Sequence, residues 1–160
     1  PQLFKAIGKE IADRYRDAGV QRIVTIEASG IALALMAALE LDVPLVFARK
    51  KKSILMVDDV YHSVVYSYTK EENYDITISK KFLPAGEKVL IIDDFLASGL
   101  AAMVLAKLVK DAGDEVVGMA IAIEKSFQPG RERLENAGFR VESLVRIKEF
   151  KDNKCVFIED

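Results

Sequence analysis

The sequence predicts an α/β fold in which a mainly parallel sheet is covered by helices on both faces. Short apolar, β-branched segments alternate along the chain with longer amphipathic or apolar segments. This alternation is typical of βαβ units, whose crossover helices bury both faces of a parallel sheet. The exception is the stretch 53–81, where polar and aromatic residues alternate and predict an exposed hairpin.

The first half of the chain has the pattern of two helices and two strands. Apolar residues recur at helical spacing over 3–15, and Gly19 follows as a stop signal, so the chain opens with an amphipathic helix. The β-branched run 22–26 is typical of a buried strand. After a short turn, an apolar helix is expected over 31–39. A second strand over 45–48 follows a proline and leads into a basic run.

The second half continues the alternation after the hairpin, whose strands are expected over 63–68 and 74–78. An apolar strand over 89–92 leads through a loop into a helix over 100–112, which Gly113 ends. The remaining expected elements are a strand over 116–124, a short helix from about Pro129 to before Gly138, and strands over 139–147 and 155–158. Ligands of such sheets bind at the carboxyl ends of the strands.

Composition narrows the class of protein further. The 160 residues fit a single compact domain over 1–160, and 51% hydrophobic with 30% charged residues is a globular balance. The formal net charge of -2 gives no field that would attract nucleic acid or anionic lipid, and no apolar run is long enough to span a membrane. We therefore expect neither nucleic acid nor a membrane as a partner.

Cysteine and histidine usage excludes two further classes of protein. Cys155 is the only cysteine and His62 the only histidine, so neither an internal disulfide nor a Cys-His zinc cluster is available. A lone cysteine is typical of proteins from a reducing compartment. We therefore expect a cytoplasmic protein without a structural metal.

The strongest functional signal is VLIIDDFLASGLA, residues 89–101. Its apolar strand delivers two adjacent carboxylates, Asp93 and Asp94, which suit the vicinal hydroxyls of a ribose as hydrogen-bond acceptors. The alternative, acids that merely cap the turn, explains one Asp but not two. A turn follows at a predicted helix N-terminus, where unpaired N–H groups and the helix dipole attract a phosphate. The residues of that turn are Ala97, Ser98, Gly99, Leu100 and Ala101.

This motif resembles the phosphoribosyl pyrophosphate (PRPP) motif of type I phosphoribosyltransferases. The resemblance implies the type I phosphoribosyltransferase fold with its protruding hairpin loop, and transfer of ribose 5-phosphate from PRPP to a base. Asp93 and Asp94 would hold the ribose, and residues 97–101 the 5'-phosphate. Two positions depart from many members, because Ala97 stands where an acid is common and Ala101 where threonine is common. The adenine and xanthine branches of the family share the alanine at the first position.

Two further segments follow strand ends and favour the same interpretation. The turn Glu27-Ala28-Ser29-Gly30 resembles the family's pyrophosphate loop, which often holds a cis peptide; the alternative is an ordinary helix cap. In the basic run 49–52, Arg49 and one lysine would neutralise the pyrophosphate leaving group, and the alternative is a solvated charge run. The hairpin segment 66–70 resembles the mobile loop that closes over the substrates, with a plain exposed hairpin as the alternative.

The segment 123–131 is the candidate for binding the base. Lys125 follows a central strand and would donate to a purine oxo group, and its charge favours xanthine, the most acidic of the common purines; the alternative is a surface lysine. Phe95 would pack against the base or, with equal reason, against the sheet. This segment, with FARKKK, VYSYTK and GFRVESL, resembles the bacterial xanthine branch of the family.

That branch implies a purine salvage enzyme that converts xanthine and PRPP into XMP and pyrophosphate. It implies Mg²⁺ bound mainly through PRPP with no metal site of the protein's own, and a homodimer. Members carry an N-terminal segment that forms a hood over the purine, and we expect that segment to be missing from residues 1–160. The alternatives are an adenine phosphoribosyltransferase and the PRPP-sensing regulatory domain of a purine repressor, which would have no use for a lysine that reads a base.

Overall fold

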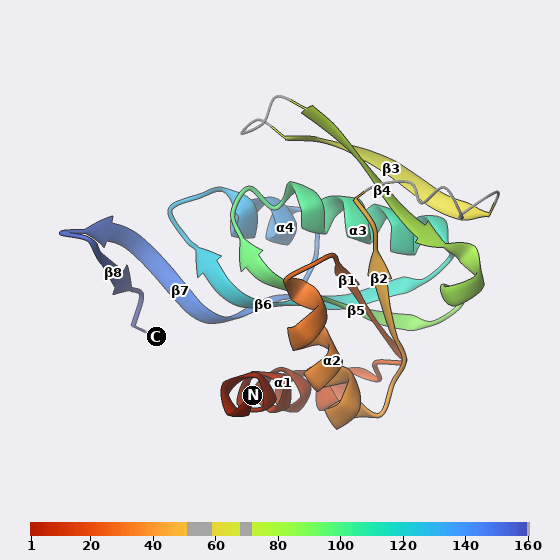
Figure 1. Ribbon diagram of the computed structural model, residues 1–160, viewed down its shortest axis with the longest axis horizontal. Helices are drawn as coiled ribbons and strands as arrows, with labels where there is room; N and C mark the ends of the chain where they lie inside the picture. Colours follow the sequence, from red (N-terminus) through yellow and green to blue (C-terminus); the bar gives the residue numbers. More distant parts are fainter. Residues whose placement is uncertain (51–58, 68–71, 160) are drawn as a thin grey trace.

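Figure 1 shows the computed structural model of the chain, in which residues 1–50, 59–67 and 72–159 are described. The helices are α1 (Gln2–Tyr15), α2 (Gly30–Leu41), α3 (Leu100–Asp111) and α4 (Gly130–Asn136), with single 3-10 turns at Arg16–Ala18 and Lys80–Phe82. The strands are β1 (Arg22–Ile26), β2 (Leu45–Ala48), β3 (Val60–Ser67), β4 (Glu72–Ser79), β5 (Lys88–Leu96), β6 (Glu115–Lys125), β7 (Val141–Lys151) and β8 (Lys154–Phe157). None of the helices in this described part is long and apolar enough to cross a lipid bilayer.

Six strands form one sheet in the order β2-β1-β5-β6-β7-β8, and β3 and β4 form a separate antiparallel pair. Every neighbouring pair in the large sheet is parallel except β7 and β8. In Figure 1, α1 and α2 lie on one face of this sheet and α3 and α4 on the other. The predicted fold class, a mainly parallel sheet with helices on both faces and a protruding hairpin, is therefore confirmed.

The order of the strands changes direction beside β1, and this change places the site. From β1 the chain passes through α2 to β2 on one side, whereas β5 lies on the other side of β1 and leads through α3 to β6. Ligands of open α/β sheets bind at such a switch point, beyond the carboxyl ends of the strands. The turns that follow β1 and β5, residues 27–30 and 97–101, therefore lie beside each other.

Alternation along the strands divides the core between the two faces of the sheet. Ile23 and Leu90 are fully buried on the side of α1 and α2, whereas Val24 and Ile91, one residue further on, are fully buried on the side of α3. Successive side chains of a strand point to opposite faces. Strands buried on both faces explain why the apolar runs of the sequence are nearly continuous.

The β3-β4 hairpin is more buried than the sequence predicts. His62 and Val64 on β3 are exposed, but Ile76, Thr77 and Ile78 on β4 have exposed fractions of 2%, 0% and 1%. The two isoleucines complete the core beside α3, and Figure 1 shows the hairpin lying over that helix. The expectation of an exposed hairpin is therefore wrong for β4. The tip of the hairpin, residues 68–71, lies outside the described residues.

Two of the strands that extend further than the sequence predicts carry site residues. β5 continues to Leu96 because its ladder with β6 continues to that residue. Asp93 and Asp94 are therefore the last part of a strand and not of a loop. β6 likewise includes Lys125 as its final residue. Charged side chains end the apolar pattern of both strands while backbone pairing continues. A prediction from hydrophobic periodicity alone therefore ends each strand too early.

Candidate active site

Asp93 and Asp94 form the acidic end of β5. Asp93 is 8% exposed, and one of its carboxyl oxygens accepts a hydrogen bond from the backbone N–H of Asp94 at 3.0 Å. Burial, together with the hydrogen bond and charge of the Asp94 side chain, raises the pKa of Asp93 to about 7. The hydrogen bond from the Asp94 backbone and, to a smaller extent, the positive charge of Lys50 lower this pKa. Asp93 is therefore divided between acid and carboxylate near neutral pH.

The turn after β5 forms a pocket of backbone N–H groups. Gly99 has a φ of +77°, a left-handed conformation that favours glycine. Among the described residues, no acceptor binds the backbone N–H groups of Ser98, Gly99 or Ala101, and the N–H of Leu100 reaches only the Ser98 hydroxyl, at 3.4 Å. Such groups at the start of α3 fit a phosphate. A cavity of about 110 Å³ is lined here by Asp93, Phe95, Leu96, Ala97, Ser98, Gly99, Leu100, Ala101, Ala102 and Ile121.

The same turn rests directly on the first residue of α4. A Cβ atom at Gly130 would lie 2.3 Å from the carbonyl oxygen of Ala97, and one at Gly99 would lie 3.1 Å from the Cα of Gly130. The two backbones therefore meet without a side chain between them. Arg133 of α4 also donates to the Ser98 carbonyl. Spacing along the sequence relates neither Gly130 nor Arg133 to the turn, so both were missed.

The turn after β1 meets the acidic end of β5. The peptide bond after Glu27 is cis, the feature that the family resemblance implies. The Glu27 carboxylate accepts the backbone N–H of Lys50 at 2.7 Å, which ties this turn to the basic run. A Cβ atom at Gly30 would lie 2.4 Å from the Thr25 hydroxyl and 3.2 Å from a carboxyl oxygen of Asp93. Gly30 therefore brings the start of α2 against Asp93, and the two turns belong to one site.

The middle of that turn faces solvent. Ala28 and Ser29 are exposed, and the Ser29 side chain makes no capping hydrogen bond to α2. The ordinary helix cap, the alternative interpretation of this tetrapeptide, is thus not what the side chains form. Within the described part of the chain, the buried Thr25 hydroxyl near Gly30 has no hydrogen-bond partner.

Arg49 follows β2 and pairs with the hairpin through its backbone. Its N–H and carbonyl form hydrogen bonds of 2.9 and 3.0 Å with Thr77 on β4. Its side chain is exposed, and the guanidinium carbon lies 5.7 Å from the centre of the Phe47 ring. The guanidinium can therefore contact an anion at this end of the sheet. Lys51 and Lys52, expected beside it, lie outside the described residues, as do residues 68–70 of the expected mobile loop.

Lys125 and Phe95 form a cation-π pair at the carboxyl ends of β6 and β5. The ammonium of Lys125 lies 5.3 Å from the centre of the Phe95 ring. Phe95 is 46% exposed, whereas its neighbour Leu96 is 2% exposed. Leu96 therefore packs inside the core, whereas part of the Phe95 ring stays accessible to a planar ligand.

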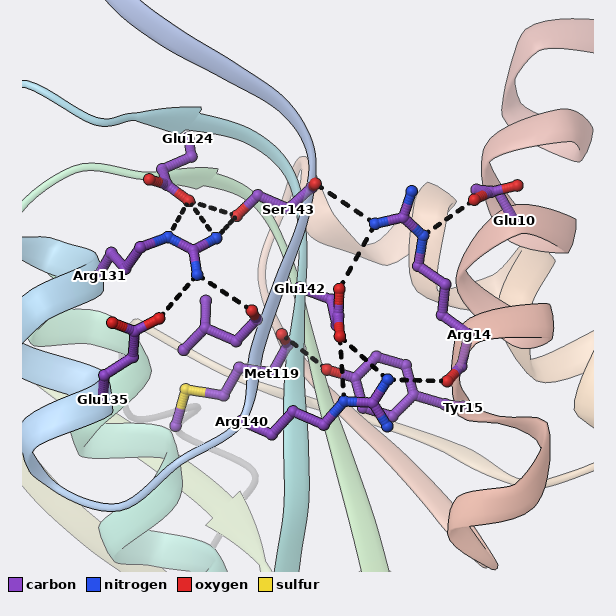
Figure 2. Close-up of polar contacts among 11 residues, drawn as sticks. Glu10, Arg14, Tyr15, Met119, Glu124, Arg131, Glu135, Arg140, Glu142 and Ser143 are labelled. Atoms are coloured by element: carbon purple, nitrogen blue, oxygen red, sulfur yellow. Dashed lines mark hydrogen bonds and ion pairs between the residues drawn. The ribbon is translucent and has the colours of Figure 1, made fainter. Parts of the chain in front are cut away.

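A buried charge cluster that we did not expect from the sequence surrounds Glu124, the residue before Lys125 (Figure 2). Glu124 is 1% exposed and accepts hydrogen bonds from Arg131 at 2.8 Å, Ser126 at 2.7 Å and Ser143 at 2.6 Å. Burial alone would raise the pKa of Glu124, but these hydrogen bonds outweigh it and lower the pKa to about 2. The only feature of the sequence that could have indicated this cluster is Glu124 itself, a single acid at the end of an otherwise apolar strand.

Comparison with known proteins assigns the class. Residues 1–150 match the phosphoribosyl transferase domain, and the chain belongs to that family. Adenine phosphoribosyltransferase from Rhodothermus marinus matches with a TM-score of 0.81 at 28% identity, over 92% of this chain and 81% of that one. The Giardia lamblia adenine enzyme, complexed with 9-deazaadenine, gives 0.82 at 26% identity, over 93% and 82% of the two chains. The type I fold implied by the PRPP motif is therefore confirmed.

Curated relatives named for xanthine, and not for adenine, are more similar to this chain in sequence than these solved structures are. The xanthine phosphoribosyltransferase of Exiguobacterium sp. is 54% identical over 159 residues, which is 99% of this chain and 82% of the relative. That of Acinetobacter baumannii is 51% identical over 160 residues, 100% of this chain and 84% of the relative. The resemblance to the xanthine branch is confirmed, and with it the class of enzyme, a glycosyltransferase that transfers a pentosyl group.

Proposed function

We propose that this protein transfers ribose 5-phosphate from PRPP to xanthine, giving XMP and pyrophosphate in purine salvage. The observation that carries this proposal is the 54% and 51% identity to xanthine phosphoribosyltransferases, which extends over 99% and 100% of the chain and so includes every element of the site. The chemistry of Lys125 supports the choice of base. Its ammonium can donate to an oxo group of xanthine, and adenine has no such group.

The acidic end of β5 and the turn after it would bind the ribose 5-phosphate half of PRPP. Asp93 and Asp94 accept hydrogen bonds from the ribose hydroxyls, while the N–H groups of residues 97–101 and the Ser98 hydroxyl bind the 5'-phosphate. A diol that donates to Asp93 favours the ionised form of that carboxyl. Binding of PRPP should therefore lower the pKa of Asp93 from the value near 7 that burial imposes.

The turn after β1 and the basic run would bind the pyrophosphate half. The backbone N–H groups of residues 28–30 and the guanidinium of Arg49 stabilise the negative charge that grows as the bond between ribose and pyrophosphate breaks. Glu27 contributes by accepting a hydrogen bond from the backbone N–H of Lys50 at 2.7 Å, which fixes the position of that residue. Lys125 and the ring of Phe95 hold the base against the ribose. Catalysis on this scheme consists of positioning and electrostatic stabilisation, without a covalent intermediate.

Mg²⁺ enters the proposal as a partner of PRPP. Among the described residues, no group of three or more His, Cys, Asp or Glu side chains could hold a metal ion. Asp93 and Asp94 nevertheless offer the hard oxygen donors that Mg²⁺ accepts, which fits an ion held mostly by substrate oxygens and water. Such an ion supplies positive charge to the leaving pyrophosphate. Removal of Mg²⁺ with a chelator should stop turnover, and its return should restore turnover.

The test of the proposal is nucleotide formation from PRPP and Mg²⁺ with xanthine, hypoxanthine, guanine and adenine in parallel assays, separated by chromatography. Xanthine should give the highest kcat/KM. A preference for adenine would instead assign the protein to the adenine branch. Binding of PRPP without turnover of any base would identify a PRPP sensor and overturn the proposal.

We also propose that the protein acts in the cytoplasm as a homodimer. The single cysteine, Cys155, is exposed as a free thiol, which favours a reducing compartment. Leu3 and Leu39, with exposed fractions of 70% and 68%, leave apolar surface that a second copy could cover. Sedimentation velocity should give the mass of two chains, and a monomeric mass at all protein concentrations would exclude the dimer.

A further inference from the structure

Helix α4 lies between the two loops assigned to the base and to the 5'-phosphate. It has only 7 residues, and a helix this short is not stable by itself in water, so its position depends on the contacts of its side chains. Two of those side chains, Arg131 and Arg133, bind different partners. The partners belong to different halves of the site.

Arg131 binds the buried carboxylate on the base side. Its Nε donates to Glu124 at 2.8 Å, and a terminal nitrogen lies 2.7 Å from the same carboxylate oxygen (Figure 2). The Ser126 hydroxyl donates to the other oxygen at 2.7 Å. Lys125 lies between Glu124 and Ser126 in the chain. One carboxylate therefore fixes both ends of the base loop, residues 125–130.

Contacts with β7 hold the base loop along its length. The backbone N–H of Ser126 donates to the carbonyl of Ile147 at 2.9 Å. The ring of Phe127 meets that of Phe150 edge-on, with centroids 5.6 Å apart. From the same strand, the Ser143 hydroxyl donates to the buried carboxylate at 2.6 Å. The loop that begins at Lys125 is thus bound to its neighbours at several points.

Arg133 acts on the phosphate side, through a single peptide unit. Its guanidinium donates to the carbonyl oxygen of Ser98. In a trans peptide the carbonyl and the N–H of the next residue point in opposite directions. An arginine that binds the Ser98 carbonyl from α4 therefore directs the N–H of Gly99 away from that helix. Among the described residues this N–H has no acceptor, and it is one of the donors assigned to the 5'-phosphate.

We propose that Arg131 and Arg133 are positioning residues for two different substrates: Arg131 holds Lys125 for the purine through Glu124, and Arg133 holds the Gly99 N–H for the 5'-phosphate of PRPP. Helix α4 thereby fixes the spacing between the two subsites. The identity of the two substrates rests on the proposed function. If α4 were only a structural support, damage to either arginine would affect both substrates alike.

The experiment compares Arg131→Lys, Arg133→Lys and the control Arg140→Lys, each of which keeps the positive charge. Arg140 also bonds a carboxylate, that of Glu142 at 3.0 Å, but it belongs to a different set of contacts, in which it donates to the Arg14 carbonyl of α1 at 3.1 Å. Steady-state kinetics yield KM for xanthine and for PRPP with each variant, and calorimetry yields the Kd for PRPP alone. Circular dichroism verifies that each variant is folded.

Each arginine variant is expected to raise a different one of the two Michaelis constants. Arg131→Lys should raise KM for xanthine about tenfold, equivalent to about 1.4 kcal/mol, with KM for PRPP changed less than about twofold. Arg133→Lys should do the reverse and raise the Kd for PRPP, and Arg140→Lys should change neither constant. Parallel shifts in both constants, or no shift with either site variant, would overturn the proposal.

Two safeguards keep the outcome decisive. If Arg131→Lys does not fold, Ser143→Ala removes one hydrogen bond from the same carboxylate and should raise KM for xanthine alone, by about threefold; an equal rise for PRPP would refute the base-side role. If the wild-type protein turns over no purine, the proposed function fails and the role of Arg131 fails with it. Calorimetry with PRPP would still decide the role of Arg133.

Discussion

Asp93→Asn should make the protein more stable at alkaline pH although it impairs the active site. Burial, with the neighbouring Asp94, raises the pKa of Asp93 from 3.8 to about 7. Between these two pKa values the folded protein keeps a proton that the unfolded chain has lost. The stability contributed by this group is therefore complete below pH 4 and is lost as the pH rises through 7. Asparagine does not ionise, so the Asp93→Asn variant does not lose this stability as the pH rises.

The size of the effect follows from the two pKa values. A difference of about 3 units at 1.36 kcal/mol per unit is about 4 kcal/mol above pH 8, an upper bound because a local shift that admits water would reduce it. The expected gain in unfolding free energy of Asp93→Asn is near zero at pH 4 and grows toward that bound at pH 8. Loss of a charged acceptor for the ribose should lower kcat/KM by roughly 10- to 100-fold.

Urea denaturation of the wild-type protein and Asp93→Asn at pH 4, 6 and 8 measures the gain directly. Asp111→Asn is the matched control, because Asp111 is an exposed acid at the end of α3 whose ion pair with Lys107 lies on the surface. Surface pairs contribute little to stability, so the control should follow the wild-type pH profile. A difference between Asp93→Asn and the wild type that is the same at pH 4 and pH 8 would refute the pKa argument.

Three further perturbations separate the parts of the site. Lys125→Ala should raise KM for xanthine roughly tenfold and KM for PRPP much less, and a uniform rise would contradict a role in binding the base. Gly130→Ala places a Cβ 2.3 Å from the Ala97 carbonyl oxygen; it should cost about 1–3 kcal/mol in a thermal melt and weaken PRPP binding. Glu124→Gln should cost about 3 kcal/mol at pH 7, because the pKa of Glu124 is lowered from 4.5 to about 2. This stabilisation is complete above pH 5 and falls toward pH 2, so an undiminished gap in urea denaturation at pH 3 would refute it.

The parts of the fold that hydrophobic periodicity controls were predictable from the sequence. β1 and β2 have the predicted bounds, since both are short apolar runs between turn residues. β5 was predicted too short, because Asp93 and Asp94 break the apolar pattern while the ladder to β6 continues to Leu96. Backbone pairing between neighbours depends on tertiary structure, and a polar strand end has no periodic signature.

The site divides in the same way. The turn after β5, the proposed phosphate site, can be picked out from the sequence because its residues are consecutive in the chain. The Glu124 cluster cannot, because its partners come from α4 and β7 and meet only once those elements pack together. The contact between Gly99 and Gly130 likewise joins positions far apart in the chain. Such features depend on which strands are neighbours, and local spacing carries no information about that.

The bare contact between those two glycines has a practical consequence for redesign. With no side chain at the junction, a substitution at either glycine would push the turn after β5 away from α4. Libraries aimed at accepting other bases should leave positions 97–99 and 130 untouched. Diversity belongs instead at Gln128, which is partly exposed and lies between the two clamped ends of its loop.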